Sequence, residues 1–525
     1  MASDETTYDY VVIGAGSGGA VVAGRLSEDP GTRVLLIEAG GSHRKMAVRV
    51  PAAFAQQFHT DLDWDYTTEP EPHLDGRRIY HPRGRMLGGC SSQNAMIYIR
   101  GNRADFDGWA EAGAKGWSYD EVLPYFRRSE HNSRGADALH GGDGPQYVED
   151  PRSPNEVSQR MVEAMVEAGL PRNDDFNGAE QVGAGLYQVT QHRGRRWTTA
   201  DGWIAPARRR KNFTVWTDST VLRLALAGGA VAGVDVEREG RRVTVRAERE
   251  VVLAAGAFGT PHVLMLSGVG PADHLREHGV DVVVDNPNVG AHLMDHPMYV
   301  ANWETSATGT LAEAEKPAQL LRFLLRGRGL LTSNVGEAGA FFHTRDRDDA
   351  PAMQLIGAPA YFWQHGAATH PTPAVALGCS LVGSRSTGEV RLRTADPKIK
   401  PAVRFDYFAE PEDMAAMVAG LERAREVMAA GPLRGIIGKE IHPGGDVGHD
   451  DLVRDVRRKV EHTYHPSCTA RIGTEVTGVV DPELRVHGVT GLRVADASVF
   501  PRVTHGNTHA PTLMVGEKAA DLLRG

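Results

Sequence analysis

One stretch near the start of the chain, residues 8–41, constrains the fold more than any other. It opens with a β-branched run at 11–13, which is typical of a buried parallel strand. Gly14, Gly16 and Gly19 follow in the pattern G-x-G-x-x-G. The first glycine allows a tight turn, the second lets the backbone approach a pyrophosphate, and the third lets a helix pack on a strand. The pattern predicts a strand, a phosphate-binding turn and a helix.

The residues that follow complete a β-α-β unit. Small residues at helical spacing lead to a second apolar strand at 33–37, which ends in Glu38. Glu38 lies 19 residues after Gly19, at the distance where a carboxylate hydrogen-bonds the ribose of an adenosine. A strand, glycines, a helix, a strand and an acid in this register predict an adenine dinucleotide site.

Composition narrows the class of protein. The 525 residues exceed one ordinary core, and a formal charge of −9 argues against nucleic acid as a main partner. Cys90, Cys379 and Cys468 are too few and too widely spaced for a disulfide framework or a paired-cysteine zinc motif, so we expect a reducing, cytoplasmic setting and no metal. Residues 1–7 do not resemble a signal peptide, and no apolar run is long enough to cross a bilayer. We expect a protein without a transmembrane segment that is soluble or at most peripherally attached.

Several segments of the first half suggest ligand contacts. Residues 51–80 are rich in aromatic side chains that are either ordinary core or the lining of an apolar pocket. Gly88 and Gly89, followed by small polar residues, are typical of a loop whose backbone approaches a large flat or charged ligand. Residues 132–154 are rich in Gly, Asp and Pro, as in a domain crossing, and 156–170 have the apolar spacing of a helix.

The middle of the chain returns to strands. Residues 213–216, 221–226, 231–236 and 242–247 have the pattern of a meander, and 250–253 of a further buried strand. Pro261 is expected at the first position of a helix that stops at Gly268. Residues 389–393, 479–486 and 491–500 are further expected strand segments.

The last 70 residues carry candidate chemistry. His465 stands directly before a proline, which biases its backbone toward an extended conformation and can hold the imidazole in one place. Residues 504–511 open a helix that runs through 523, with Pro511 in its first turn. The partial positive charge of such an N-terminus favours a nearby anion.

Five blocks in order resemble the glucose-methanol-choline (GMC) oxidoreductases, the FAD-dependent alcohol oxidases and dehydrogenases. They are VVIGAGSGGAVVAGRLSE, HPRGRMLGGCSSQNAMIYIRG, GAFGTPHVLMLSGVGP, NVGAHLMDHP, and YHPSCTARIG with LRVADASVFPRVTHGNTHAPTLMVGEKAADLL. The resemblance covers essentially the whole chain and is nearest to the choline oxidase and choline dehydrogenase branch. It implies a flavoprotein with FAD, which composition and spacing alone do not distinguish from NAD.

The resemblance implies an α/β fold (α+β overall) with two discontinuous parts. A Rossmann-like FAD-binding domain comprises residues 1–155, 197–297 and 463–525. The second, substrate-binding domain comprises residues 156–196 and 298–462 and is built on an antiparallel sheet covered by helices.

The resemblance also implies the site residues. His465 matches the family's catalytic histidine, and Asn507 matches its partner. Val221 would contact the adenine through its backbone, Asp496 and Ala497 would lie beside the pyrophosphate, and the turn at 507–512 would meet the flavin. The full set of implied cofactor contacts is Gly14, Gly16, Ser17, Gly18, Gly19, Glu38, Ala39, Arg85, Gly88, Gly89, Ser92, Asn94, Ala95, Val221, Asp496, Ala497, Asn507, Thr508, Pro511 and Thr512.

The chemistry of alcohol oxidation fits these roles. An alcohol proton is too weakly acidic to leave unaided at neutral pH, so a positioned neutral imidazole, His465, would accept it as hydride moves to flavin N5. Asn507 would donate a hydrogen bond to the oxygen as it becomes alkoxide-like. His462 and His509 either line this site or flank it.

Two departures from the choline branch matter for the substrate. Gln93 stands where some choline oxidases carry a histidine joined to flavin, so non-covalent FAD is expected. Met298 stands where the glutamate facing the choline ammonium is found, and Ile356 appears in place of a further polar histidine. A neutral, apolar or aromatic primary alcohol is therefore favoured, with choline as the alternative. The expected substrate contacts are Phe54, Met298, Glu337, Ile356, Phe362 and Tyr464.

Other readings stay open. Glu337 is either a substitute anion for the missing glutamate or, by preference, a member of a structural ion pair. A non-redox member of the same scaffold, such as a hydroxynitrile lyase or a fatty-acid photodecarboxylase, is a second alternative, and the intact His465 and Asn507 argue against the photodecarboxylase. The electron acceptor is O2, a quinone or another electron carrier, and a homodimer is possible.

Overall fold

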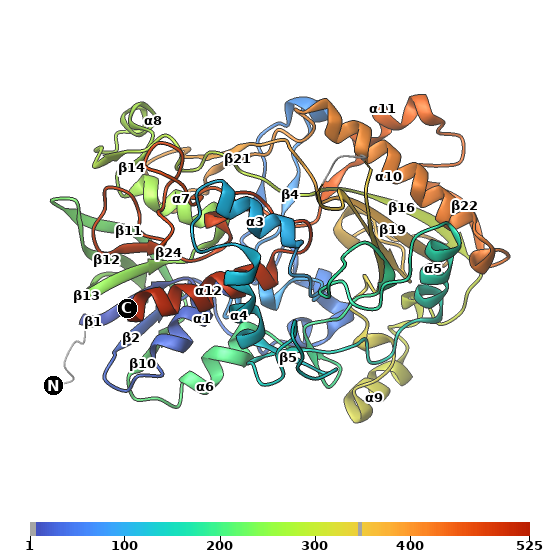
Figure 1. The fold of residues 1–525 in the computed structure, drawn as a ribbon, viewed down its shortest axis with the longest axis horizontal. Coiled ribbons are helices and arrows are strands. Elements are labelled where there is room, and N and C mark those ends of the chain that lie inside the picture. The colour runs from blue at the N-terminus through green and yellow to red at the C-terminus, as the bar shows by residue number, and fades with distance from the viewer. Residues whose placement is uncertain (1–6, 345–348) are drawn as a thin grey trace.

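The computed structural model describes residues 7–344 and 349–525, and two sheets dominate it (Figure 1). The sheet at the left of the view begins with the glycine motif and is largely parallel, whereas the sheet at the right is antiparallel. Helices pack against both sheets. This arrangement confirms the predicted fold class, a Rossmann-like unit joined to an antiparallel sheet covered by helices.

The first sheet has the strand order β10-β2-β1-β13-β12-β11, with β24 paired to β13. Residues 11–13 of β1 are almost fully buried between parallel neighbours on both sides, which explains their β-branched run. Its strands are β1 (Thr7–Ile13), β2 (Val34–Ile37), β10 (Phe213–Trp216), β11 (Ser219–Ala227), β12 (Ala230–Arg238), β13 (Arg241–Leu253) and β24 (Leu492–Val494).

Two strand predictions in this sheet need correction. Residues 213–216 are not part of the meander, because β10 pairs with β2 in parallel at the sheet edge. Residues 242–247 and 250–253 are one continuous strand, β13. The N-terminal half of β13 pairs antiparallel with β12 and its C-terminal half pairs parallel with β1, so one strand joins the meander to the parallel sheet.

Pro261 lies inside α7 (Gly256–Leu266), not at its start. The helix begins five residues earlier because the carboxylate of Asp496, distant in sequence, accepts a hydrogen bond from the Gly256 N–H (2.8 Å). Pro261 cannot donate to the carbonyl of Ala257 one turn earlier. The hydroxyl of Thr469 donates to that carbonyl instead (2.7 Å), so the proline is accommodated without an unpaired acceptor.

The expected C-terminal strands are shorter than predicted. Residues 491–500 contribute only the three-residue β24, followed by a 3₁₀ turn, η9 (Ala497–Val499). Residues 479–486 form isolated bridges, through Val480, Arg485 and Val486, and not a strand. The expected strand at 389–393 is present but is limited to β20 (Glu389–Arg391).

The second sheet has the order β22-β16-β19-β18-β17-β7, with β23 paired to β16, and every pairing is antiparallel. One face packs against α5 (Glu156–Glu167) and α10 (Pro411–Ala429). Its strands are β7 (Gly183–Leu186), β16 (Pro297–Thr305), β17 (Ala338–Phe342), β18 (Met353–Ala358), β19 (Ala374–Leu381), β22 (Ile437–His442) and β23 (Glu461–His462).

The two ends of the chain meet in the first sheet. Helix α12 (His509–Arg524) lies against α1 (Ser17–Leu26), and the Tyr10 hydroxyl donates to the carbonyl of Leu523 (2.8 Å) (Figure 1). The fully buried carboxylate of Glu517 on α12 pairs with Arg25 (2.9 Å) and with Arg128 (2.7 Å). Residues at opposite ends of the sequence therefore share one core.

An excursion, residues 306–337, connects β16 to β17 and carries α9 (Pro317–Arg326), which projects at the lower right of Figure 1. Within the described ranges, no helix is both long enough and apolar enough to span a membrane. The other helices of four or more residues include α2 (Met46–Arg49), α3 (Arg103–Glu111), α4 (Tyr119–Ser129), α8 (Ala272–Glu277) and α11 (His449–Lys459).

Candidate active site

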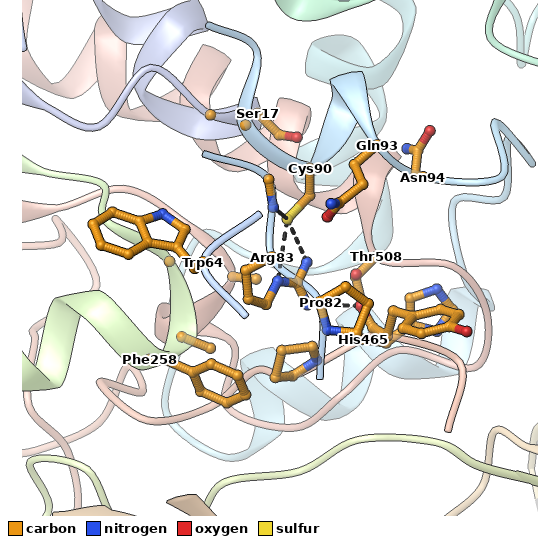
Figure 2. Close-up of a pocket in the computed structure, with 18 of the residues that line it drawn as sticks. Ser17, Trp64, Pro82, Arg83, Cys90, Gln93, Asn94, Phe258, His465 and Thr508 are labelled. Atoms are coloured by element: carbon orange, nitrogen blue, oxygen red, sulfur yellow. Dashed lines mark hydrogen bonds between the residues drawn. The ribbon is translucent and has the colours of Figure 1, made fainter. Parts of the chain in front are cut away.

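A long cavity runs between the two sheets, from the carboxyl ends of β1 and β2 to the inner face of the antiparallel sheet. Fifteen of the expected cofactor residues line it: Gly14, Gly16, Ser17, Gly18, Glu38, Ala39, Gly89, Asn94, Ala95, Val221, Asp496, Ala497, Asn507, Thr508 and Thr512. His465 lines it as well. Residues from both ends of the chain thus surround one cavity (Figure 2).

The glycine turn has a different environment at each position. A Cβ on Gly14 would lie 2.3 Å from the Ala254 carbonyl oxygen, and one on Gly19 would lie 2.0 Å from the Gly14 oxygen. A Cβ on Gly18 would lie 1.9 Å from the Ala495 oxygen. In contrast, nothing lies within 4 Å of the position of a Cβ on Gly16. Three glycines therefore allow protein backbones to meet, whereas Gly16 leaves open space toward the cavity.

Glu38 presents a buried carboxylate next to this turn. Its oxygens accept hydrogen bonds from the backbone N–H groups of Ala15 and Gly40, both at 2.9 Å. Burial raises the pKa of Glu38 to about 7, against the lowering effect of these hydrogen bonds. The acid is positioned as an acceptor for a hydroxyl ligand.

The loop at 83–97 forms one wall. Gly89 has φ +50°, and a Cβ there would lie 2.8 Å from Gly16 Cα, so this loop packs directly on the glycine turn. Arg83 donates to the Cys90 thiol (3.1 Å from Nε) and to the Tyr464 carbonyl (2.8 Å), which ties this wall to the segment of His465 (Figure 2).

Arg196 holds Asn94 in place by hydrogen bonds, and no pattern in the sequence predicts this role. Its buried guanidinium donates to the backbone oxygen (2.6 Å) and side-chain oxygen (2.8 Å) of Asn94. The only sequence signal is an arginine in the strand-like pair at 195–196, which is not distinguishable from a surface charge. Burial lowers the pKa of Arg196 to about 9.

Five expected cofactor residues lie behind the cavity wall. Gly19 packs α1 on the first sheet, as described above, and Pro511 is buried within the first turn of α12. Gly88 donates its N–H to the Ala15 carbonyl (2.9 Å), and the Ser92 hydroxyl donates to the Leu87 carbonyl (2.8 Å). Arg85 stacks on Trp64, 5.1 Å from the ring centroid. These residues shape the wall without lining it.

Asp496 lines the cavity, but its oxygens are already engaged. One oxygen accepts from Gly256 N–H (2.8 Å) and the Thr260 hydroxyl (2.6 Å), and the other accepts from Ser498 N–H (2.7 Å). Burial raises its pKa. The carboxylate fixes the start of α7 and the turn η9 at the cavity wall.

His465 and Asn507 lie next to each other in the lining of the cavity. The Asn507 amide nitrogen lies 3.2 Å from His465 Nε2, and Gln354 donates to the Asn507 amide oxygen (3.2 Å). Because Gln354 occupies the oxygen, the NH2 group is the side that faces His465, which makes Nε2 an acceptor without a proton. The proton of a neutral His465 is then on Nδ1.

His296 accepts a hydrogen bond from the Nδ1–H group of His465. Its Nδ1 lies 3.0 Å from His465 Nδ1, so Nδ1–H of His465 donates to His296. Burial is the main cause that holds the pKa of His465 well below its ordinary value, and burial lowers the pKa of His296 to about 4. Both histidines are neutral at pH 7, and the unprotonated Nε2 of His465 faces Asn507. Only the block NVGAHLMDHP marks this histidine in the sequence.

Asp295 holds both histidine segments. One carboxylate oxygen accepts from the backbone N–H groups of His296 and His465, both at 2.7 Å. The other oxygen accepts from the Tyr407 hydroxyl and pairs with His81 Nε2, both at 3.0 Å. A single buried acid therefore fixes the positions of both imidazoles.

His81, Asp295 and His462 bring potential metal ligands within 4.8 Å of one another. Both nitrogens of His462 are occupied, since Nε2 donates to the Tyr80 carbonyl (2.8 Å) and Nδ1 accepts from Tyr464 N–H (3.1 Å). The group is therefore a hydrogen-bonded network behind the cavity, and His462 flanks the site.

His509 lines the cavity at the start of α12. Its Nδ1 lies 2.9 Å from the Ser17 hydroxyl, and its buried Nε2 has no hydrogen-bond partner among the described residues. Burial lowers its pKa to about 4. Gln93 Nε2 is likewise a buried donor at the cavity without a described partner. Two polar atoms are thus available to a ligand here.

The end of the cavity beyond His465 is apolar. Five of the expected substrate residues line it: Phe54, Met298, Ile356, Phe362 and Tyr464. Met298 lies on β16 and Ile356 lies on β18. The face of the second sheet that does not pack against α5 and α10 therefore forms the floor of the cavity. Phe54 stacks on Phe362 with centroids 6.1 Å apart. The aromatic segment at 51–80 therefore contributes to a pocket lining, including Phe58, Trp64 and Tyr66.

The expectation that Glu337 contacts substrate is wrong. Its carboxylate is buried outside the cavity lining, where it accepts from the Ser333 hydroxyl and from Asn155 N–H (2.7 Å). The expected ion pair of Glu337 is also absent among the described residues, because the carboxylate is hydrogen-bonded to a hydroxyl group and to a backbone amide. The acids in the lining, within residues 7–344 and 349–525, are Glu38 and Asp496, both beside the glycine turn.

Comparison with known proteins gives consistent matches. Two family models described as GMC oxidoreductase match residues 8–298 and 384–516. An uncharacterised GMC-type oxidoreductase of Mycobacterium tuberculosis is 44% identical, over 99% of this chain and 100% of its own length. An oxygen-dependent choline dehydrogenase of Sinorhizobium fredii is 40% identical, over 98% of this chain and 95% of its own. Formate oxidase of Aspergillus oryzae, in a structure whose description concerns FAD modification, superposes with a TM-score of 0.94 at 28% identity, over 100% of this chain and 99% of that one.

The glycine turn generates a matched pair of substitutions. Gly18→Ala places a methyl group 1.9 Å from the Ala495 carbonyl and should lower the free energy of unfolding by about 1–3 kcal/mol. Gly16→Ala meets no atom within 4 Å and has a φ of −77°, so the cofactor-free protein should unfold as the wild type does, while dinucleotide affinity falls. Urea unfolding and cofactor titration test both. Equal destabilisation by the two variants would contradict this assignment.

Proposed function

The chain belongs to the GMC oxidoreductase family, and we propose that it is an FAD-dependent enzyme that oxidises a neutral primary alcohol to the aldehyde. The observation that carries the proposal is the pair of His465 Nε2 and the Asn507 amide (3.2 Å apart) at the junction of a dinucleotide cradle and an apolar pocket. A base with a bare nitrogen and a donor beside it are the two groups that deprotonation of an alcohol requires.

The residues around the glycine turn fit FAD. The open space at Gly16 can admit a pyrophosphate, and the N-termini of α1 and α12 both reach the cavity, where their partial positive charge favours anionic groups. Glu38 would accept from the ribose, and Gln93 and His509 offer unpartnered nitrogens to the flavin end. FAD would be held non-covalently, because an amide at position 93 cannot form the histidine linkage. Bound FAD supplies the hydride acceptor, its N5 atom.

His465 would act as the general base. Its bare Nε2 accepts the hydroxyl proton of the alcohol, and the resulting imidazolium keeps its Nδ1–H directed at His296 Nδ1 (3.0 Å). Asn507 donates to the substrate oxygen as negative charge develops there. Asp295 and Gln354 hold these two groups in place, which lowers the entropy cost of reaching the reactive geometry.

The apolar end of the cavity supports a neutral alcohol. Met298 and Ile356 contribute no charge, and no acid of the described chain lines the cavity near them. A quaternary ammonium would have only cation–π contacts with Phe54 and Phe362. Choline remains the second candidate, because the Sinorhizobium fredii relative is named a choline dehydrogenase. A photodecarboxylase activity is disfavoured by the His465–Asn507 pair, because that reaction needs no base for a hydroxyl proton. Oxygen, a quinone or another electron carrier would reoxidise the enzyme.

Removal of the base tests the mechanism. His465→Ala should lower the anaerobic rate of flavin bleaching by an alcohol by about 10²–10⁴-fold, because the substitution removes the unprotonated Nε2 that accepts the hydroxyl proton. The variant should stay yellow, since His465 does not hold the dinucleotide. Asn507→Ala should lower the same rate by about 10²–10³-fold. Stopped-flow spectroscopy measures both. Unchanged bleaching by His465→Ala would exclude His465 as the base.

The pH profile tests the charge state of the base. Protonation of His465 inactivates it, and burial holds its pKa well below its ordinary value of 6.5. The acid limb of kcat/KM is therefore expected below pH 6.5, so that activity stays constant as the pH falls from 7.5 to 6.5. Circular dichroism over the same range controls for unfolding. An acid limb centred above pH 6.5 would show that the pKa of the base is not lowered.

A charge at position 298 tests the substrate class. The wild type should prefer apolar or aromatic primary alcohols to choline in kcat/KM. Met298→Glu should shift the ratio toward choline by about tenfold, because a carboxylate pairs with the ammonium, whereas the uncharged Met298→Gln should not. Steady-state kinetics with benzyl alcohol and choline compares the three proteins. A wild-type preference for choline would favour the second candidate.

A further inference from the structure

The outer face of α9 is the most apolar exposed surface of the described chain. Of eight large hydrophobic side chains that are exposed, four lie on this helix: Leu320 (45%), Leu321 (58%), Leu324 (49%) and Leu325 (74%). At 3.6 residues per turn, positions i, i+1, i+4 and i+5 share one face. Scattered single apolar residues are ordinary on a surface, whereas a contiguous cluster marks an interaction site.

The orientation of α9 is fixed by its inner side. Phe323 is 1% exposed and lies under the Arg195 guanidinium, 5.6 Å from the ring centroid. Gly327, in a left-handed conformation (φ +56°), ends the helix, and its N–H donates to the Phe323 carbonyl (2.8 Å). The helix's own anchor therefore directs the leucine face away from the body. The helix lies at the lower edge of the molecule (Figure 1).

The polar residues next to the leucine face are basic. Arg322 and Arg326 lie beside it on α9, and Arg328 follows the helix; all three are exposed. Among the ion pairs of the described residues, none involves these three arginines, and α9 itself carries no acid. Lys316, before the helix, is paired with Glu313. An apolar stripe bordered by uncompensated arginines is complementary to anionic headgroups above acyl chains.

We propose that α9 is an interfacial helix that docks this protein on an anionic phospholipid bilayer. The four leucines would enter the boundary of the acyl chains, and the arginine side chains would extend to the phosphates. A second copy of the chain fits less well, because α9 itself carries arginines and no acid, so two copies of the helix that cross at this face would bring like charges together; the exposed Glu315 lies before the helix. The proposal does not depend on the proposed reaction.

The position of α9 gives the docking a specific geometry. The excursion that carries it leaves and re-enters the body at Leu311 and Val335, and both residues pack in the apolar cluster that includes Phe54 and Met298. The same cluster lines the apolar end of the cavity. The segments on either side of α9 therefore join a helix docked on a bilayer to the residues at the apolar end of the cavity.

Vesicle flotation of the full-length, FAD-loaded protein tests the proposal. The wild type should float with vesicles of phosphatidylcholine and phosphatidylglycerol, less with phosphatidylcholine alone, and less at high salt. The double variant Leu321→Glu/Leu325→Glu should bind at least about tenfold more weakly. Val283→Glu/Val476→Glu adds the same charge at two exposed apolar positions elsewhere (43% and 82% exposed) and should float as the wild type does.

The remaining outcomes are decisive as well. Retention of wild-type visible absorbance and melting temperature shows that a loss of flotation is not a loss of fold or cofactor. Arg322→Gln/Arg326→Gln should weaken binding to the anionic vesicles alone. Equal flotation of the leucine variant and the wild type would overturn the proposal. So would a wild-type dimer in sedimentation velocity that dissociates in the leucine variant while neither protein floats, because α9 would then be a contact between copies.

Discussion

Close approach of backbones around the glycine turn is the constraint on which the rest of this structure depends. Gly14, Gly18 and Gly19 let α1 and the end of β1 lie against the carbonyls of Ala254, Ala495 and Gly14 at distances that exclude any side chain. The carbonyls of Ala254 and Ala495 belong to the segments that follow β13 and β24, so the turn also contacts the chain just before α7 and η9 begin. With three glycines committed to packing, the fourth, Gly16, remains open toward the cavity.

The candidate active site is assembled by buried acids whose oxygens are hydrogen-bonded within the protein. Asp496 starts α7, Asp295 holds the segments of His296 and His465, and Glu517 joins α12 to α1 and α4 through two arginines. Each carboxylate accepts hydrogen bonds from backbone N–H groups or from neighbouring side chains. A buried acid that is fully paired in this way is rigid, and it transfers that rigidity to the imidazoles and helix ends beside it.

Local patterns predicted the parts of the structure that are governed by local physics. The glycine turn, β1, β2 and α5 follow from β-branched runs, glycine positions and apolar spacing, and the order of the five blocks identified the residues around the cavity. Contacts between distant segments decided the rest. Pro261 sits inside α7 because Asp496 and Thr469 satisfy the helix from elsewhere, and β10 joins the parallel edge because β2 is available there. Arg196 carries no local signal, and Asp295 is marked only by its place in the block NVGAHLMDHP, which does not indicate that it holds two histidine segments. Neighbours in sequence also do not show that Ser333 and Asn155 hold the Glu337 carboxylate away from the cavity, so the sequence predicts a substrate contact there.

The meeting of the two chain ends has a consequence for biosynthesis. The parallel sheet that begins at residue 7 gains its last strand at Leu492–Val494, and α12 closes over α1 only near residue 524. At about 5–20 residues per second, a ribosome needs roughly 25–105 s to make 525 residues. For nearly all of that time the glycine turn lacks the carbonyl of Ala495 and the partner helix on which α1 packs. The dinucleotide cradle is therefore complete only late in synthesis, and a nascent chain that stalls before β24 leaves the face of α1 that packs on α12 uncovered.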